Sequence, residues 1–290
     1  MELVIRNLNK QYGNGVHALN DVSLTIPKGM FGLLGPNGAG KSSLMRTLAT
    51  LQDADSGSAM LGNIDVLNNK DAVRKVLGYL PQEFGVYPRT SAFDLLDYLA
   101  VIKGFNNKTE RKQMVLDLLH KVNLYEQRKK AVSSFSGGMR QRFGIAQCLI
   151  GSPSLVIVDE PTAGLDPGER NRFYNILSEI GEHVIVILST HIVQDVRELC
   201  TQMAIMDKGR VLFSGDTDEA LRQIKGKVWE KRIDKEQLGE YQQNYKVISS
   251  KLVGGKPMIH VFSEAQMNGG FIPAEENLED VFFAQLNELV

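Results

Sequence analysis

The stretch with the clearest chemistry is a glycine-rich loop, Gly35-Pro36-Asn37-Gly38-Ala39-Gly40-Lys41-Ser42. It fits the P-loop pattern, in which glycines let successive backbone N–H groups curl around phosphate oxygens. The helix that we expect to follow adds its positive N-terminal end. Lys41 is then placed to reach the β- and γ-phosphates of a nucleotide, and the Ser42 hydroxyl to bind Mg²⁺. The nucleotide-binding residues expected here are Gly35, Pro36, Asn37, Gly38, Ala39, Gly40, Lys41, Ser42 and Ser43.

Four short apolar runs end abruptly at a glycine or a polar residue. They are Met30–Leu34, Val76–Leu80, Leu155–Val158 and Val184–Leu188. Unbroken apolar runs of this length are typical of strands buried on both faces, and therefore of a mostly parallel sheet covered by helices. Such sheets bind their ligands outside the carboxyl ends of the strands. The side chains that follow the four runs are therefore candidates for one shared site.

Two carboxylates, a glutamine and a histidine stand at these positions. We expect Asp159 to hold Mg²⁺, directly or through water, and Glu160 to act as general base on the attacking water. Gln82 is expected near the metal and the water, and His191 at the γ-phosphate. Each one alone is explained equally well as an ordinary loop start, so the prediction depends on their occurring together. The expected catalytic residues are Lys41, Gln82, Glu160 and His191, and the expected metal ligands are Ser42, Gln82 and Asp159.

Two further features belong to the same hypothesis. Tyr12 precedes Gly13 and is a candidate for stacking on an adenine base, with a core tyrosine as the alternative. Ser136-Gly137-Gly138 opens a predicted helix and is a second anion-binding pattern, with a simple helix cap as the alternative. The P-loop already provides one anion-binding loop, so the role of the second loop has to be explained.

Taken in order, these motifs resemble one family closely, the ATP-binding subunits of ABC transporters. The resemblance covers Met1 to about Asp216. Its motifs are Tyr12, GPNGAGKSS from Gly35, Gln82, SGG from Ser136, LVIVDEPT from Leu155, AGLD from Ala163, and His191. The resemblance implies ATP with Mg²⁺, ATP hydrolysis coupled to transport, and an α/β fold: a P-loop NTPase (RecA-like) core with a helical insertion.

The resemblance also gives the second anion loop a purpose. Two such subunits, identical or related, pack head to tail, and each ATP lies between the P-loop of one and the signature loop of the other. Ser136, Gly137 and Gly138 would therefore bind a nucleotide held by the partner, and Asp166 would lie at the interface. Met139 stands where the family usually has glutamine, which removes an amide. We expect a tuned site, since the serine and both glycines remain.

The chain divides into three expected regions. An ABC ATPase domain spans residues 1–216, with a core of 1–83 and 154–216 and a helical subdomain of 84–153. Residues 217–290 are expected to form a small α+β accessory segment. Within it we expect a hairpin of Val247–Val253 and Pro257–Phe262. A helix is expected to follow, with Leu278, Val281, Phe282 and Leu286 on one face.

The expected partner is a separate transmembrane permease, which places the chain peripherally on the cytoplasmic face of the membrane. Phe84, Val86 and Tyr87 are candidates for a cleft that receives the permease, or else for the core of the helical insertion. The stretch Asn277–Phe283 resembles the end of subunits of drug, antibiotic and polysaccharide exporters, although a packing helix explains it nearly as well. It favours export over import.

Composition limits the alternatives. The 290 residues are 43% hydrophobic and 23% charged with a net charge of −1, so no basic excess indicates nucleic acid. The N-terminus lacks the features of a signal peptide, and no apolar run is long enough to span a membrane. Cys148 and Cys200 are expected to be buried free thiols. The alternative function is a soluble ABC-type ATPase that acts on DNA or ribosomes.

Overall fold

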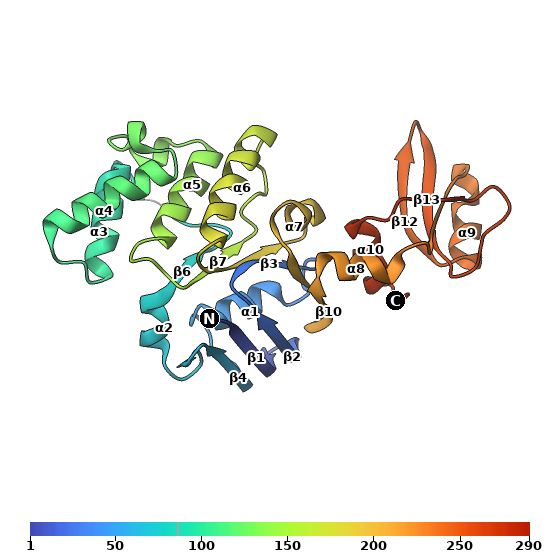
Figure 1. Ribbon diagram of the computed structural model, residues 1–290, viewed down its shortest axis with the longest axis horizontal. Coiled ribbons are helices and arrows are strands. Elements are labelled where there is room, and N and C mark those ends of the chain that lie inside the picture. Colours follow the sequence, from blue (N-terminus) through green and yellow to red (C-terminus); the bar gives the residue numbers. More distant parts are fainter. Residues whose placement is uncertain (86) are drawn as a thin grey trace.

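A six-stranded sheet lies at the centre of the larger, N-terminal part of the molecule. The computed structural model describes residues 1–85 and 87–290, and Figure 1 shows helices on both sides of this sheet. Its order is β10-β9-β3-β8-β7-β6, with β10 antiparallel to β9 and the other five strands parallel. The strands are β3 Gly29–Leu34, β6 Leu77–Leu80, β7 Leu155–Asp159, β8 Ile185–Thr190, β9 Gln202–Asp207 and β10 Arg210–Asp216. The mostly parallel sheet is confirmed.

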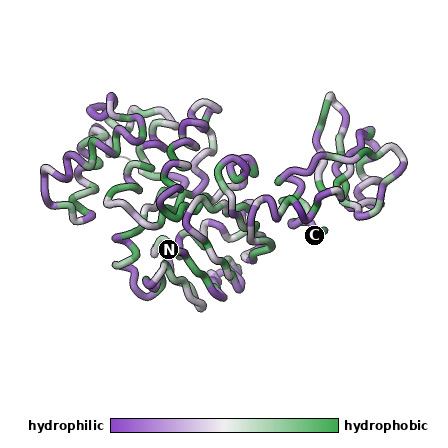
Figure 2. Tube along the Cα trace, viewed as in Figure 1, coloured by the Kyte–Doolittle hydropathy of each residue, from purple (hydrophilic) through white to green (hydrophobic). Residues whose placement is uncertain are grey.

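The sheet separates two hydrophobic cores, because alternate side chains of each strand point to opposite faces. On β7, Val156 and Val158 join one core, whereas Leu155 and Ile157 join the other. The first core contains side chains of α5 Gly137–Cys148, α6 Pro167–Gly181 and α7 Val193–Leu199. The second contains α1 Lys41–Leu48 and a further sheet. In Figure 2 the apolar stretches gather at this centre.

That further sheet is antiparallel and was not predicted from the sequence. Its order is β2-β1-β4-β5. The strands are β1 Leu3–Gln11, β2 His17–Ile26, β4 Ser56–Leu61 and β5 Ile64–Asp65. Buried and exposed residues alternate along β2, so one face of this sheet meets solvent. The unbroken apolar runs that revealed the parallel strands are therefore missing here.

Helices fill the region between β6 and β7. They are α3 Ala92–Ile102, α4 Lys108–Lys121, the 3₁₀ turns η1 Tyr125–Gln127 and η2 Val132–Ser134, and α5. The short α2 Lys70–Val76 precedes β6. The ammonium of half-buried Lys103 donates to the carbonyls of Leu77 (3.2 Å) and Ile150 (3.0 Å). These bonds tie the end of α3 to β6 and to the turn after α5. The helical character expected for this region is confirmed, whereas its limits stay a prediction.

A small separate sheet lies at the C-terminal end of the molecule, at the right of Figure 1. Its order is β12-β13-β11-β14, and the expected hairpin is confirmed as β12 and β13. Gly254 and Gly255 form its turn with φ angles of 61° and 82°, which glycine adopts without strain. The elements are α8 Thr217–Ile224, β11 Val228–Arg232, η3 Lys235–Gln237, α9 Leu238–Asn244, β12 Val247–Val253, β13 Lys256–Phe262, β14 Ile272–Pro273 and α10 Leu278–Leu286.

The last helix returns to the core beside the six-stranded sheet. Leu278, Val281 and Phe282 of α10 belong to the same buried cluster as Phe213 of β10 and Ala220 of α8. The small sheet has its own cluster, centred on Ile259. Packing therefore crosses the expected boundary after residue 216, and that boundary stays a prediction.

Cys148 and Cys200 are buried free thiols, as predicted, and burial raises the pKa of the Cys148 thiol to about 12. Among residues 1–85 and 87–290, none of the helices has both the length and the apolar character needed to cross a bilayer.

Candidate nucleotide site

The glycine-rich loop joins β3 to α1, as the phosphate-binding hypothesis requires. Gly38 and Gly40 have φ angles of 83° and 104°, in the left-handed region that favours glycine. A Cβ atom at Gly40 would lie 2.4 Å from the carbonyl oxygen of Ala18, so the chain also passes too close for a side chain. The loop conformation thus depends on the glycines, and α1 begins directly after it at Lys41.

Lys41 is buried beneath this loop, with 4% of its surface exposed. Its ammonium donates to the carbonyls of Gly35 (2.6 Å) and Pro36 (3.1 Å). Burial lowers the pKa of the Lys41 ammonium, while the carboxylates of Glu160 and Asp159 act in the opposite direction. The cation is therefore held at the base of the loop, facing the carboxyl ends of the strands.

Glu160 lies at the centre of the side chains predicted for catalysis. Its Oε1 atom is 3.2 Å from His191 Nδ1 and 3.9 Å from Lys41 Nζ. Its Oε2 atom accepts a hydrogen bond from Gln82 Nε2 at 3.4 Å. The structure thus brings together residues that follow β3, β6, β7 and β8. Glu160 also has a φ of 47°, a strained value for a side chain of this kind, and such strain is concentrated at functional sites.

Asp159 is suited to a cation. Its side chain is buried, and its Oδ1 atom has no hydrogen-bond partner in the described part of the chain. Ser189, its neighbour across the β7–β8 pair, also keeps a buried hydroxyl oxygen without a partner there. Buried oxygens in this state are costly unless a ligand satisfies them. Among residues 1–85 and 87–290, no group of three His, Cys, Asp or Glu is placed to hold a metal. Mg²⁺ is commonly held by one or two carboxylates together with phosphate oxygens and waters.

A pocket of about 270 Å³ lies over the loop. It is lined by Tyr12, Val16, Ala18, Asn37, Gly38, Ala39, Gly40, Lys41, Ser42, Ser43, Gln82 and Glu160. Ser42 and Asn37 are exposed at its surface. Most of the residues predicted to bind the nucleotide therefore share one pocket, although they come from separate parts of the sequence.

Tyr12 is held at the rim of this pocket by its hydroxyl. That hydroxyl bonds Ser43 Oγ (3.0 Å) and donates to Gln52 Oε1 (3.1 Å). Gln52 in turn donates to the carbonyl of Ser43 at 2.9 Å. The sequence analysis missed Gln52, because an isolated glutamine after a helix carries no recognisable pattern. It connects the tyrosine to the first turn of α1.

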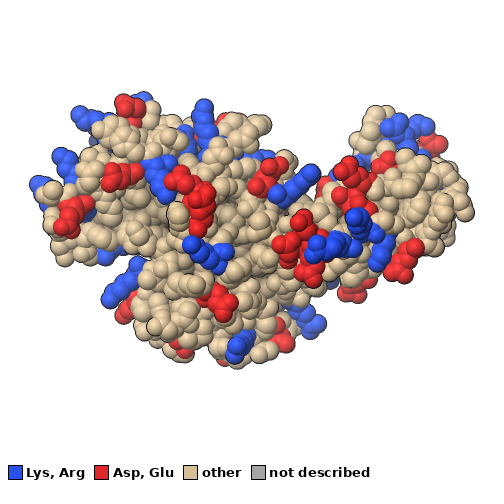
Figure 3. All heavy atoms as spheres, viewed as in Figure 1, with Lys and Arg blue, Asp and Glu red and all other residues tan. Residues whose placement is uncertain are grey.

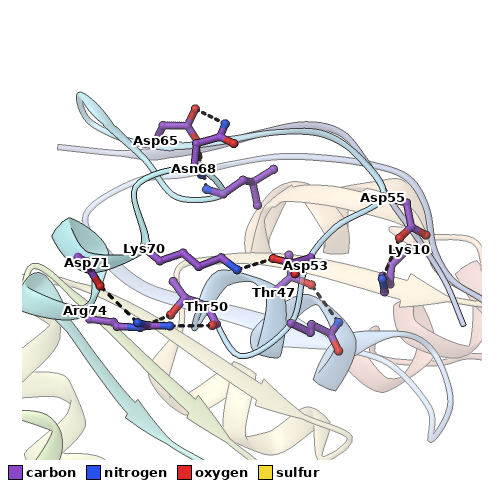
Figure 4. A network of polar contacts seen from close by, with 12 residues as sticks. Lys10, Thr47, Thr50, Asp53, Asp55, Asp65, Asn68, Lys70, Asp71 and Arg74 are labelled. Atoms are coloured by element: carbon purple, nitrogen blue, oxygen red, sulfur yellow. Dashed lines mark hydrogen bonds and ion pairs between the residues drawn. The ribbon is translucent and has the colours of Figure 1, made fainter.

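Figure 4 shows polar contacts beside this segment and, separately, at the turn after α1. Asp55 accepts from Lys10 Nζ at 2.8 Å and from the backbone N–H of Gln11 at 2.6 Å, directly before Tyr12. The hydrogen bond from Lys10 lowers the pKa of the Asp55 carboxyl. Further along, Lys70 pairs with Asp53, and Arg74 donates to the Thr50 hydroxyl at 3.0 Å, which fixes α2 against the turn after α1.

The second anion loop does not line this pocket. Ser136 is the N-cap of α5, and its hydroxyl accepts from the N–H of Met139 at 3.3 Å. Ser136 and Gly137 are exposed, whereas Gly138 is buried against Glu169 of α6, so closely that a Cβ atom there would clash. Asp166, the N-cap of α6, is exposed as well. The structure does not bring these residues to the chain's own P-loop.

A buried ion pair fixes the second anion loop against α6. Arg142 Nη2 lies 3.1 Å from Glu169 Oε2, and the same guanidinium donates to the carbonyls of Val122 (3.3 Å) and Asn123 (3.2 Å). Glu169 also pairs with Arg172 at 2.7 Å. The pair joins α5 to α6, and removal of either partner would leave the other charge without its counter-charge. Sequence reasoning missed this pair, since the two residues lie on different helices.

Known proteins are similar to this chain in sequence and in fold. The sequence profile of the ABC transporter family matches residues 19–163. The chain is 31% identical to an ABC transporter ATP-binding protein of Bacillus subtilis called YxlF, over 97% of this chain and 98% of that one. It is 36% identical to the methionine import ATP-binding protein MetN of Clostridioides difficile, over 77% of this chain and 71% of that one.

Two more similarities bear on function and fold. The linearmycin resistance ATP-binding protein LnrL of Bacillus subtilis is 32% identical over 77% of this chain and 72% of its own length. Among solved structures, the dimeric bacterial ABC transporter cassette MJ0796 superposes with a TM-score of 0.67 at 24% identity. The match covers 74% of this chain and 98% of that cassette, and it shows the fold.

The position of Tyr12 leads to a test of base stacking. Stacking on a base is worth about 1–3 kcal/mol, so we expect Tyr12→Ala to weaken ATP binding by about 5- to 150-fold. Tyr12→Phe keeps the ring and loses only the bonds to Ser43 and Gln52, and should bind ATP far more tightly than the alanine variant. Calorimetric titration of the full chain with ATP measures both. Equal affinity of the two variants would contradict stacking.

Proposed function

Since this chain belongs to the ATP-binding subunits of ABC transporters, we propose that two such subunits close head to tail around ATP and drive a separate permease in the direction of export. Proteins of this family are ATPases, and they dimerise and work with transmembrane subunits. The observation that carries the proposed chemistry is the convergence of Lys41, Gln82 and His191 on the Glu160 carboxylate.

In the proposed reaction Glu160 is the general base. It takes a proton from a water whose oxygen attacks the γ-phosphorus, while the bond from that phosphorus to the β–γ bridging oxygen breaks and ADP leaves. His191, at 3.2 Å from Glu160, holds the carboxylate and contacts the γ-phosphate. Lys41 neutralises charge on the β- and γ-phosphates. Gln82 holds the other carboxylate oxygen and senses the occupied site.

Residues at the loop fit Mg²⁺. Ser42, Gln82 and Asp159 would hold it, with the orphan Oδ1 atom of Asp159 as the buried anionic ligand. When bound, Mg²⁺ withdraws charge from the phosphate oxygens. The chain's own part is to keep Asp159 fixed at the end of β7, beside Ser189 of β8.

The second anion loop serves the partner's ATP in this proposal. Ser136 and Gly137 are exposed at the start of a helix and lie outside the pocket of Lys41, so they are free to meet a nucleotide that a second subunit presents. Asp166, exposed at the start of α6, would face the same partner. The buried pair of Arg142 and Glu169 keeps these two loops in a fixed relation.

The permease would contact the helical region. On α3, Tyr98 and Ile102 expose 54% and 64% of their surface, and Tyr87 exposes 60%. Exposed apolar side chains on neighbouring turns are typical of a protein interface. Phe84 instead packs against Gly144 of α5, as its alternative interpretation as insertion core predicted. Val86 lies outside the described residues.

Export rests on one similarity. The exporter-like stretch Asn277–Phe283 begins α10, whose Leu278, Val281 and Phe282 pack in the core, as the alternative of a packing helix expected. The similar protein LnrL is named for resistance to linearmycin. MetN, which is similar as well, is named for import, so the direction depends on the partner. Through that partner the chain would sit at the cytoplasmic face of the membrane. Basic and acidic side chains are interspersed on the face drawn in Figure 3, so this face is not the continuous basic surface that binds nucleic acid.

Replacement of Glu160 by glutamine tests the base. The amide keeps the shape and the contact to Gln82, but it cannot take a proton, so we expect hydrolysis to fall about 10²- to 10⁴-fold with ATP affinity retained. Phosphate release measured beside ATP binding on the full chain separates the two effects. Turnover equal to that of the unchanged chain would remove Glu160 from this role.

Replacement of Ser136 by arginine tests the second loop. A bulky cation at the start of α5 should leave ATP binding to the monomer intact and block the ATP-dependent dimer in the Glu160→Gln background. Light scattering with and without ATP gives the mass directly. The matched control is Ser250→Arg on β12, an exposed serine in the C-terminal sheet, which should dimerise normally. An ATP-induced dimer of the Ser136 variant would refute the shared site.

Capture of the partner tests the function as a whole. The tagged Glu160→Gln chain is expressed in its own cells, membranes are extracted in mild detergent with ATP and Mg²⁺, and stoichiometric partners are identified by mass spectrometry. We expect a polytopic membrane protein. Recovery of ribosomes or DNA-bound proteins, with no membrane protein, would favour the alternative of a soluble ABC-type ATPase.

A further inference from the structure

A fully buried carboxylate lies beneath the catalytic loops. Asp195 of α7 has 0% of its surface exposed. It accepts three hydrogen bonds, all from hydroxyl groups: Thr162 Oγ1 at 2.6 Å and Thr190 Oγ1 at 2.8 Å to Oδ2, and the Tyr174 hydroxyl at 2.5 Å to Oδ1. Burial raises the pKa of the Tyr174 phenol, and the bond to Asp195 raises it further, so this hydroxyl stays a donor.

Two of these hydroxyls belong to the segments that carry the proposed catalytic residues. Thr162 follows Glu160 by two residues, and Thr190, the last residue of β8, directly precedes His191. The Thr190 hydroxyl also accepts from the N–H of Ile192 at 2.9 Å. It therefore holds the backbone on both sides of His191. One carboxylate oxygen therefore binds both segments at the same point.

A buried carboxylate is expensive and is tolerated when strong donors surround it. Asp195 has such donors, yet an apolar residue would fill the same space at lower cost. The carboxylate joins the segment that follows β7 to the end of β8, and so fixes the distance between them. Glu160 needs such support, because its φ of 47° persists only where the surroundings hold it. Its N–H bonds the carbonyl of Ser189 at 2.9 Å, directly beside Thr190.

We propose that Asp195 is a positioning residue for ATP hydrolysis, which through Thr162 and Thr190 sets the distance between Glu160 and His191. It is fully buried and does not line the pocket over the glycine loop, so it would act on the rate through these two segments. This inference rests on the proposed catalytic roles of Glu160 and His191. It adds a link between the two loops that neither motif contains by itself.

The test removes the two threonine hydroxyls one at a time. Thr162→Val and Thr190→Val keep the side-chain shape but delete a donor to Asp195, whereas replacement of Asp195 itself would strand three buried donors and test folding. We expect each variant to lower kcat by about 10- to 100-fold, as small misplacements of catalytic groups do, with the ATP affinity unchanged. Thr162→Ser and Thr190→Ser keep the hydroxyl and should restore most of the rate.

A matched control separates positioning from stability. Thr50 is a buried threonine whose hydroxyl accepts from Arg74, away from these two segments. Thr50→Val should lower the melting temperature to a similar degree and leave kcat, corrected for folded protein, unchanged. All variants are measured in the full chain, with melting temperature, ATP affinity and phosphate release recorded together.

The outcomes are distinct. Loss of kcat at unchanged ATP affinity in both valine variants, with recovery in the serine variants, supports the inference. If the valine variants lose activity only in proportion to folded protein, as Thr50→Val does, Asp195 is structural and the inference is wrong. If Glu160→Gln hydrolyses ATP normally, the proposed function fails first. If Glu160→Gln is inactive while both valine variants keep full kcat, the inference alone fails.

Discussion

The parallel pairing of β3, β8, β7 and β6 is the constraint on which the rest of the structure depends. Parallel strands end at the same edge of a sheet, so whatever follows each strand is delivered to one place. In this chain the four strands are followed by the glycine loop with Lys41, by Gln82, by Glu160 and by His191. No single segment contains the site. It exists because four runs of apolar residues bury both faces between two cores.

The same architecture leaves the site open on one side. The P-loop lies at the carboxyl ends of the parallel strands. Ser136 instead begins a helix of the insertion and does not line the pocket. In the proposed dimer, each chain would therefore supply one half of each of two sites. The pair of Arg142 and Glu169 joins the signature helix to α6, and Asp195 joins α6 and α7 to the loops of Glu160 and His191. These buried polar contacts connect the surface that would meet a partner with the residues that would hydrolyse ATP.

The motifs allowed much of this to be predicted from sequence, and the misses have physical causes. The strands β3, β6, β7 and β8 were found because burial on both faces makes them continuously apolar. The sheet of β1, β2, β4 and β5 was missed because one face meets solvent. Asp195 was missed because a carboxylate in a short helix reads as surface, and only the fold surrounds it with three hydroxyls. The packing of α10 on the ATPase core depends on long-range contacts that a helical pattern does not specify.

The most direct measurement is a crystal structure of the Glu160→Gln chain with ATP and Mg²⁺. Our account predicts a head-to-tail dimer, with each ATP between Lys41 of one subunit and Ser136 of the partner. His191 and the residue at position 160 would both face the γ-phosphate. ATP bound to a single subunit, or a dimer in which Ser136 lies away from both nucleotides, would contradict it.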